Sequence, residues 1–429
     1  MSAQTAPRQF AQITNPVVRL RMRQLALFAG MLLSGGLLLI PREPLLALVL
    51  ILCFALTNPL SLFRREFSLV WIVLALTVAV ALIGGQSFQV MPMVIRYANF
   101  FGGLALLAMY LGESRRTLAD DLYPILKLMA FQALLTPFVY ILFQGYFWSF
   151  QVHNTIYTTL FYIFTFHDLI DTGSLFKRPD GFFFEPGVFH IYLNIFLFIA
   201  LFVRKRSPFD IALAALAVMA TQSTTGVIVL MMQFAYAYFN WLKTADRGQK
   251  LGVFVFVPLL LMPLAGYMAY NVVEKFTGEF RGSAEAREYD LVTGLRVVAE
   301  QPLTGIGFDE ERYFDYSQRL GYREVDLSDE NITERGNTNG IVSLLFNLGI
   351  PMGAMFLFGV FRQRMFAPRL LFAGIIIVSL LTEALFLKPF FLMIAFSGLL
   401  LVTSKVKARK RDPRVQMAAR APAAPPKNA

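Results

Sequence analysis

The chain has 429 residues, of which 56% are apolar and 16% charged, and its mean hydropathy is +0.57. A soluble protein of this length is less apolar, so the composition indicates an integral membrane protein. The net charge of +11 is uneven along the chain, and we interpret it as a topology signal and as contact with anionic lipids, not as nucleic-acid binding. The single cysteine, Cys53, lies in an apolar run and excludes a disulfide framework or a thiolate metal site.

Apolar runs of about 17–25 residues, the length that spans a bilayer as a helix, recur along the chain. The expected spans are 24–40, 44–62, 67–84, 89–111, 122–143, 186–203, 208–222, 225–242, 251–271, 339–361, 370–387 and 389–404. About twelve spans predict one all-α polytopic membrane domain over residues 1–405, followed by a disordered basic tail at 406–429. No cleavable signal peptide is expected, because 24–40 runs directly into the next span.

Lys and Arg cluster at every second gap between these runs. The clusters are Arg19/Arg21/Arg23, Arg64/Arg65, Arg115/Arg116, Arg204/Lys205/Arg206, Lys243/Arg247/Lys250, Arg362/Arg364/Arg369 and the residues from Lys405 onward. Basic residues mark cytoplasmic loops, so the pattern predicts a multi-pass inner-membrane protein with both termini in the cytoplasm. Two long polar segments, 144–185 and 272–338, then lie in the periplasm. The second holds 15 of the 28 acidic residues and only 8 basic ones.

These two periplasmic segments carry local signals of their own. The stretch 154–167 is rich in aromatic residues, and we expect part of it to form an interfacial helix. In the second segment, apolar residues recur at helical spacing and predict a helix at 285–300. That helix is expected to end at Pro302, before a turn formed by Gly305 and Gly307.

The first candidate site lies where a periplasmic segment enters a span, at Arg178-Pro-Asp-Gly181-Phe-Phe-Phe-Glu185-Pro186. Arg178 offers a planar set of donors suited to phosphate, and Gly181 shapes the re-entry. Burial near the membrane boundary favours Glu185 as a general base, with His190 as the second choice. The alternative is an interfacial Arg and a Glu that only stabilises a helix start.

A second candidate group follows on the predicted helix 285–300. Arg287 is a candidate for another phosphate contact, and Arg296 is a candidate for a supporting role. The alternative for Arg287 is a solvated residue paired with a neighbouring carboxylate.

Four charged residues interrupt the apolar runs: Arg96, Lys127, Glu383 and Lys388. On the predicted topology Arg96, Glu383 and Lys388 fall in the outer parts of their spans, which indicates a polar cavity open to the periplasm. An Arg96–Glu383 pair that only packs helices is the alternative. Lys127 falls near the inner end and is expected to reach the headgroups.

Asn339, at the start of the span 339–361, is a candidate for binding a sugar or for capping the helix. The three histidines, His153, His167 and His190, lack metal-ligand spacing. We therefore expect no metal and no cofactor, although the acidic run 309–311 leaves a metal open.

These motifs, in this order, resemble the O-antigen ligase/polymerase superfamily, which contains Wzy-type polymerases and WaaL-type ligases, over about residues 60–400. The matching elements are Arg178-x-x-Gly181 with Glu185-Pro186, Thr221-Gln222-Ser223 with Thr225-Gly226, Arg287 before Pro302-Leu-Thr-Gly305-x-Gly307-Phe308, and Asn339 before Gly349-Ile350. Two positions depart from the pattern. Thr338 stands where the ligase branch has a His proposed as base, and Ser223-Thr224 stands where the family has Ser-Arg.

The resemblance implies an inverting membrane glycosyltransferase, a polysaccharide polymerase that joins undecaprenyl-diphosphate-linked oligosaccharides at the periplasmic face. Without the His, the polymerase branch is favoured, and the Phe-rich sequence looks more like exopolysaccharide polymerases, including the xanthan type. Arg178 and Arg287 would then stabilise the diphosphate, assisted by Arg96 or Arg296. An O-antigen ligase is the nearest alternative, and a flippase for lipid-linked oligosaccharides is the alternative from another class. A chain-length regulator and an export complex are partners that the sequence leaves open.

Overall fold

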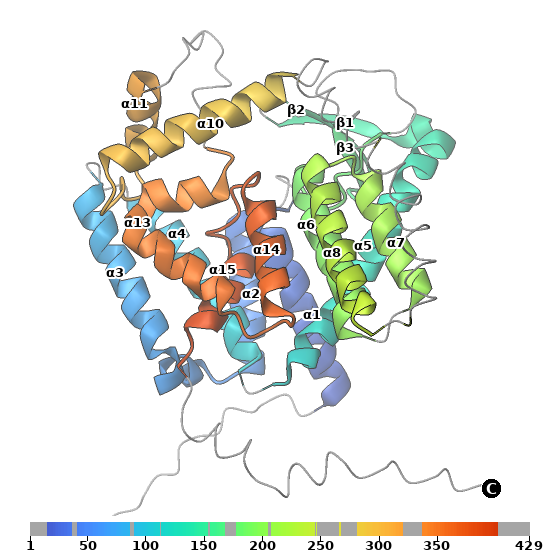
Figure 1. The fold of residues 1–429 in the computed structure, drawn as a ribbon, viewed down its shortest axis with the longest axis horizontal. Coiled ribbons are helices and arrows are strands. Elements are labelled where there is room, and N and C mark those ends of the chain that lie inside the picture. The colour runs from blue at the N-terminus through green and yellow to red at the C-terminus, as the bar shows by residue number, and fades with distance from the viewer. Residues whose placement is uncertain are drawn as a thin grey trace, which may run out of the picture.

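The computed structural model describes residues 15–36, 41–85, 90–111, 113–152, 155–167, 177–204, 207–244, 246, 266, 281–320 and 337–401. These residues are mostly helical (Figure 1). The first half contains α1 (Pro16–Leu33), α2 (Arg42–Leu56), η1 (Pro59–Phe63), η2 (Arg65–Phe67), α3 (Ser68–Gly84), α4 (Val90–Met109), α5 (Arg115–Phe143) and η3 (Gln144–Tyr146). After the strands β1 (Trp148–Val152), β2 (Thr155–Leu160) and β3 (Phe164–His167) come α6 (Pro186–Phe198), the π-helical turn η4 (Ile199–Val203), α7 (Pro208–Ala220) and α8 (Thr224–Leu242).

The last part contains α10 (Arg281–Glu300), α11 (Glu310–Leu320), α13 (Gly340–Phe361), α14 (Arg369–Leu380) and α15 (Pro389–Leu399). The predicted helix at 285–300 is confirmed by α10. Each expected span overlaps a helix, except 251–271, which lies outside the described residues apart from one position. Among the described residues, five helices are long and apolar enough to cross a membrane: Arg65–Gly84, Arg116–Tyr146, Pro186–Val203, Thr224–Leu242 and Gly340–Phe361. The number of crossings and their direction remain predictions.

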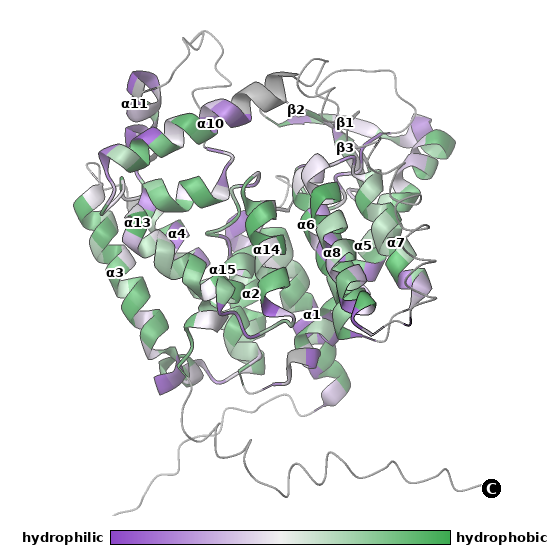
Figure 2. Cartoon of the chain, viewed as in Figure 1, coloured by the Kyte–Doolittle hydropathy of each residue, from purple (hydrophilic) through white to green (hydrophobic). Residues whose placement is uncertain are grey.

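The helices form an upright bundle around two central helices. Every residue of α6 and of α15 is buried, whereas α3 and α5 expose many large apolar side chains. Figure 2 shows the apolar bundle with polar segments at its two ends. A helix that is apolar on all sides belongs in a core or in lipid, so the exposed apolar faces of the outer helices suit a bilayer.

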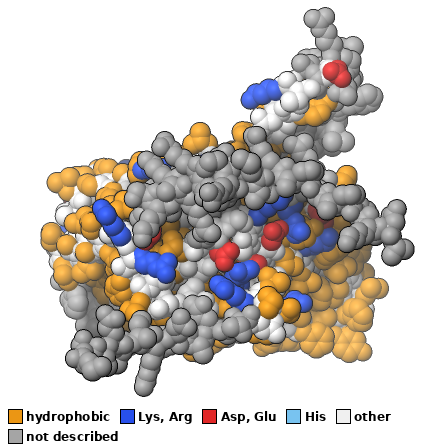
Figure 3. Space-filling model, turned by 90° about the horizontal axis from the view of Figure 1, so that it is seen from below, with side chains coloured by type: hydrophobic (Ala, Val, Ile, Leu, Met, Phe, Trp, Pro, Cys, Tyr) orange, Lys and Arg blue, Asp and Glu red, His pale blue; other side chains and the backbone are white. Residues whose placement is uncertain are grey.

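The basic clusters that the structure describes lie at one end of the bundle, the lower end in Figure 1. Arg23 on α1 pairs with Asp121 on α5 at 2.8 Å, and Arg204 after α6 lies 3.7 Å from Asp120. Figure 3 shows Lys and Arg side chains gathered on this lower face. The spacing of basic residues in the sequence therefore corresponds to one end in space, which the positive-inside rule would place in the cytoplasm.

The expected interfacial helix at 154–167 is wrong, and so the fold is not purely α-helical. These residues form β2 and β3 of an antiparallel three-stranded sheet with the order β1-β2-β3. Thr155–Leu160 is rich in β-branched residues and alternates between buried and less buried positions, which favours a strand. Trp148–Val152 supplies the partner strand. The aromatic composition indicated the membrane interface, but it did not reveal that buried and less buried positions alternate along this segment.

Helix α13 is broken at Gly349, and a turn after α10 docks into the break. Gly349 has φ 74° and ψ 165°, which are not helical. The backbone N–H of Ile306 donates to the carbonyl of Phe346 at 2.7 Å, and that of Gly307 donates to Asn347 at 3.0 Å. These bonds satisfy carbonyls that the broken helix leaves without a partner. Figure 1 shows α10 and α11 held across the top of α3 and α13.

A prediction concerns the tight packing of this turn. Gly307 has φ 70°, and a Cβ on it would collide with the backbone of Ala81 and Gly85 at the end of α3. Gly307→Ala is therefore expected to cost about 2 kcal/mol or more, from the left-handed backbone and from overpacking. Thermal unfolding in detergent measures this. The control is Gly145→Ala, because a Cβ there meets nothing within 4 Å; equal melting temperatures for the two variants would contradict the docking role.

Candidate functional site

A large cavity opens at the end of the bundle opposite the basic face. Its volume is about 1450 Å³. Its walls come from α4, the sheet, the start of α6, α10, α11, the start of α13 and the loop between α14 and α15. The lining residues fall on the side that the charge pattern predicts to be periplasmic.

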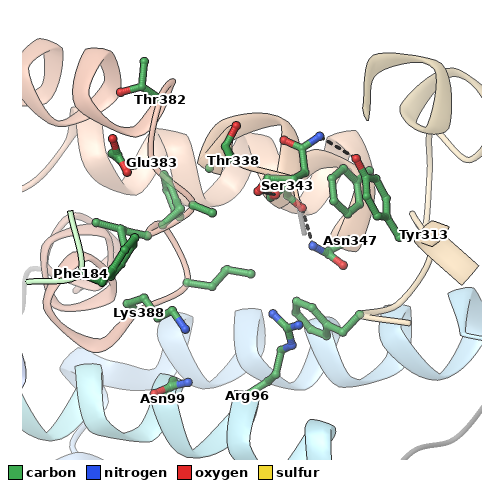
Figure 4. Close-up of a pocket in the computed structure, with 18 of the residues that line it drawn as sticks. Arg96, Asn99, Phe184, Tyr313, Thr338, Ser343, Asn347, Thr382, Glu383 and Lys388 are labelled. Carbon is green, nitrogen blue, oxygen red and sulfur yellow. Dashed lines mark hydrogen bonds between the residues drawn. The ribbon is translucent and has the colours of Figure 1, made fainter. Parts of the chain in front are cut away.

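Three charged residues that interrupt apolar runs meet in this cavity, as the sequence indicated. Arg96 on α4, Glu383 after α14 and Lys388 before α15 all line it. Figure 4 shows Arg96 reaching into the space above α4, with Lys388 and Glu383 on the loop between α14 and α15. The Arg96 guanidinium lies 5.4 Å from the ring centre of Phe308, within range of a cation–π contact. Lys127 lies elsewhere and binds Asp210 at 2.8 Å.

Arg287 joins the cavity from α10 and faces a buried carboxylate. Its Nη2 lies 4.0 Å from Oε1 of Glu383, whose side chain is 3% exposed. A buried carboxylate needs a partner to remain charged, and Arg287 supplies one. The pairing ties the outer helix α10 to the loop between α14 and α15, and it differs from the Arg96–Glu383 pair weighed from the sequence.

Glu185 is the second carboxylate beside Gly187. It lines the cavity as the residue before α6, and its side chain makes no capping hydrogen bond to that helix. A Cβ on Gly187 would collide with Oε1 of Glu383 and would lie 3.4 Å from Oε1 of Glu185. The absence of a side chain at Gly187 therefore leaves room for both carboxylates beside the start of α6.

Hydroxyl and amide groups cover the wall formed by α13. Thr338 uses its backbone N–H and its hydroxyl to donate to Oδ2 of Asp290, at 2.9 and 2.6 Å. Asn337 donates to the Tyr313 hydroxyl at 2.9 Å. Hydrogen bonds to Asp290 and Tyr313 hold these two groups in place, and hydroxyl and amide groups are of the kind that binds sugar hydroxyls.

Asn339 acts as the cap of α13. Its Oδ1 accepts hydrogen bonds from the N–H groups of Ile341 and Val342, at 3.1 and 3.0 Å. This is the capping alternative weighed from the sequence, and Asn339 does not line the cavity as the described residues form it.

Gly305 and Gly307 contribute through the backbone. They dock the turn after α10 onto α13, and they deliver Phe308 and Asp309 to the cavity wall. The sequence motif around these glycines therefore has a structural role, because it positions the residues of the cavity wall.

Four other sequence candidates do not reach the lining that the described residues form. Arg178 Nε donates to the Thr221 carbonyl at 3.3 Å, and Arg296 is exposed on α10. Gly181 has φ 65° and packs against the ring of Phe189. His190 is fully buried on α6, between that helix and α8.

The sequence did not single out the sheet residues on the cavity wall. Thr155, Tyr157 and His167 all line the cavity. The alternation along β2 would have revealed the strand, but it would not have indicated which end of the sheet faces the cavity.

Comparison with known proteins gives one match. The family model described as O-antigen ligase (Wzy_C) matches residues 211–357. This match covers 147 of the 429 residues, and it supports the resemblance of the chain to the O-antigen ligase/polymerase superfamily. No match was found among curated proteins or among solved structures.

Members of the O-antigen ligase/polymerase superfamily are membrane glycosyltransferase-like enzymes that act on lipid-linked glycans. The matched residues run from α7 into α13 and include Arg287 and Thr338. Arg96, Glu185 and Glu383 line the same cavity from outside the matched range.

A prediction tests which side of the membrane the cavity faces. Ser343 lines the cavity, and Thr244 is exposed after α8, at the end predicted to be cytoplasmic. We expect Ser343→Cys to react in intact cells with a charged, membrane-impermeant maleimide, and Thr244→Cys to react only after permeabilisation. Background is low because Cys53 is buried. Labelling in the reverse order would contradict the predicted topology.

Proposed function

We propose that this chain is a polysaccharide polymerase of the bacterial inner membrane. It joins undecaprenyl-diphosphate-linked oligosaccharide repeat units at the periplasmic face by inverting glycosyl transfer. The observation that carries the proposal is the convergence of Arg96, Arg287 and Lys388 with the carboxylates of Glu185 and Glu383 in one cavity. These side chains come from distant parts of the sequence and share no single helix.

The basic residues suit the leaving group. In this reaction the bond between the donor sugar and the diphosphate breaks, and negative charge builds up on the diphosphate. Arg96 and Arg287 offer planar donor groups for charge-assisted, bidentate bonds, and Lys388 offers a third cation. In a site shielded from bulk water such preorganised charges stabilise the transition state strongly.

The size and lining of the cavity suit two substrates. Pockets for single small ligands measure about 300–1,000 Å³, and this cavity is larger. Amides and hydroxyls on the α13 wall supply partners for sugar hydroxyls, and aromatic side chains such as Phe308 supply stacking surfaces. Holding donor and acceptor together contributes to the rate by itself.

The acceptor hydroxyl must lose a proton as it attacks the anomeric carbon. Glu185 is the carboxylate that the sequence favours for this step, and it lies on the cavity wall. Attack opposite the diphosphate inverts the configuration of the anomeric carbon.

An O-antigen ligase, with lipid A core as acceptor, is the second candidate because the matching family model carries that description. Thr338 favours the polymerase, since its hydroxyl donates to Asp290 and a threonine is no substitute for a basic imidazole. The two functions differ in the acceptor and leave the diphosphate chemistry unchanged.

A prediction follows for Arg287. In an assay with purified protein and lipid-linked repeat units, Arg287→Gln is expected to lower the rate of undecaprenyl diphosphate release by about 10²–10³, by analogy with the loss of one oxyanion donor. Arg319→Gln is the matched control, since Arg319 is an exposed arginine of α11 that contacts Glu300.

The double variant Arg287→Gln/Glu383→Gln separates catalysis from packing. Arg287→Gln alone leaves the buried Glu383 carboxylate without its arginine, and the second substitution removes that carboxylate. We expect the double variant to regain thermal stability but not activity. A regained rate would show that Arg287 only neutralises Glu383, and it would overturn the leaving-group role.

A further inference from the structure

His167 and Asp180 form a buried pair on the cavity wall. The Nδ1 of His167 lies 3.0 and 2.9 Å from the two carboxylate oxygens of Asp180. The Asp180 side chain is 0% exposed, whereas that of His167 is 12% exposed and lines the cavity. Because Asp180 holds Nδ1, Nε2 is the ring nitrogen that remains for a molecule in the cavity.

The backbone fixes both members of the pair. His167 ends β3 and stands opposite Tyr157 in the register of the sheet. The N–H of Asp180 donates to the Thr165 carbonyl at 2.9 Å, which lays the segment before α6 along β3. The imidazole is thus anchored by a strand and a carboxylate, an arrangement that fixes tautomer and orientation.

The surroundings of the pair connect it with Glu185. The Tyr157 ring lies 5.4 Å from the imidazole, and its hydroxyl donates to the carbonyl of Phe184, the residue before Glu185. Tyr157, Glu185 and His167 line one stretch of the cavity. The pair therefore lies near Glu185, the carboxylate that the sequence favours as the general base.

The charges around His167 make it a better base. Burial by itself lowers the pKa of His167, but the Asp180 carboxylate raises it above its usual value; the Arg178 charge opposes this rise and the Glu185 charge adds to it. Burial raises the pKa of Asp180 to about 6, so its carboxylate is largely ionised at neutral pH. An imidazole whose pKa is raised by a neighbouring carboxylate is a stronger proton acceptor.

We infer that His167, oriented by Asp180, is the residue that accepts the proton of the acceptor hydroxyl. This inference rests on the proposed function. The acceptor oxygen bonds to the anomeric carbon, the bond to the diphosphate oxygen breaks, and its electron pair leaves with the diphosphate. The hydroxyl proton passes to Nε2 of His167 and then to solvent. Asp180 is a positioning residue, and Glu185 adds negative charge beside the imidazole.

The test is the pH dependence of polymerisation by purified, detergent-solubilised full-length protein with lipid-linked repeat units. The wild type should lose activity as the pH falls through the pKa of His167. His167→Gln is expected to lower kcat by about 10²–10⁴ and to abolish this acid limb, because no group then titrates in that role. KM and the melting temperature should change little, since Gln keeps a donor for Asp180.

Asp180→Asn provides the second variant. Loss of the carboxylate lowers the pKa of His167, so the acid limb should move to lower pH while kcat falls less than in His167→Gln. If Asp180 had only a structural role, Asp180→Asn would not shift the acid limb of the pH profile. This variant therefore decides the question if His167→Gln does not fold.

The outcomes separate the two proposals. A His167→Gln enzyme with a near-normal rate and an unchanged pH profile overturns the inference and leaves the polymerase intact. If Glu185→Gln abolished the acid limb and His167→Gln did not, Glu185 would be the proton acceptor, and the inference for His167 would also be overturned. A wild-type protein that makes no polymer from active substrate contradicts the proposed function itself.

Discussion

The geometry of the cavity depends on one backbone contact, the docking of residues 302–307 into the break of α13 at Gly349. The N–H groups of Ile306 and Gly307 donate to carbonyls that the broken helix would otherwise leave unpaired. This contact fixes where α10 ends and α11 begins, and it carries Arg287 across the top of the bundle. Gly349 and Gly307, both with positive φ, make the close approach feasible. The same contact brings Phe308 to the wall facing Arg96.

The charged groups of the cavity are placed where an apolar bundle makes them most effective. Arg96 and Glu383 extend from helices and loops whose other faces pack in the hydrophobic core. The Glu383 side chain is buried, so its interactions are stronger than on an open surface, and leaving its charge unpaired would be more costly. A diphosphate that enters such a site would replace the pairing that Glu383 now gives Arg287.

Much of this arrangement could be predicted from the sequence, and the reason is physical. Apolar runs of spanning length can be recognised one segment at a time, so they identify the helices. The alternation of basic clusters identifies the helix ends that lie together at one end of the bundle. Charges inside apolar runs face a cavity or pair with one another, so Arg96, Glu383 and Lys388 could be grouped before any fold was known, whereas Lys127 pairs with Asp210. The pairing of β1 with β2 and the meeting of His167 with Asp180 depend on contacts between separate segments. Arg178 is a case in which the sequence misled, because its chemistry suits a phosphate. In the structure its Nε instead donates to the Thr221 carbonyl.

The most direct test of the account is the profile of lipid-linked and surface glycans in a strain that lacks this protein. The account predicts single repeat units on undecaprenyl diphosphate in the outer leaflet and no polymer, with polymer restored by the wild-type gene. Polymer of normal length that never reaches lipid A would instead establish a ligase. Repeat units retained on the cytoplasmic leaflet would contradict the catalytic interpretation of the cavity altogether.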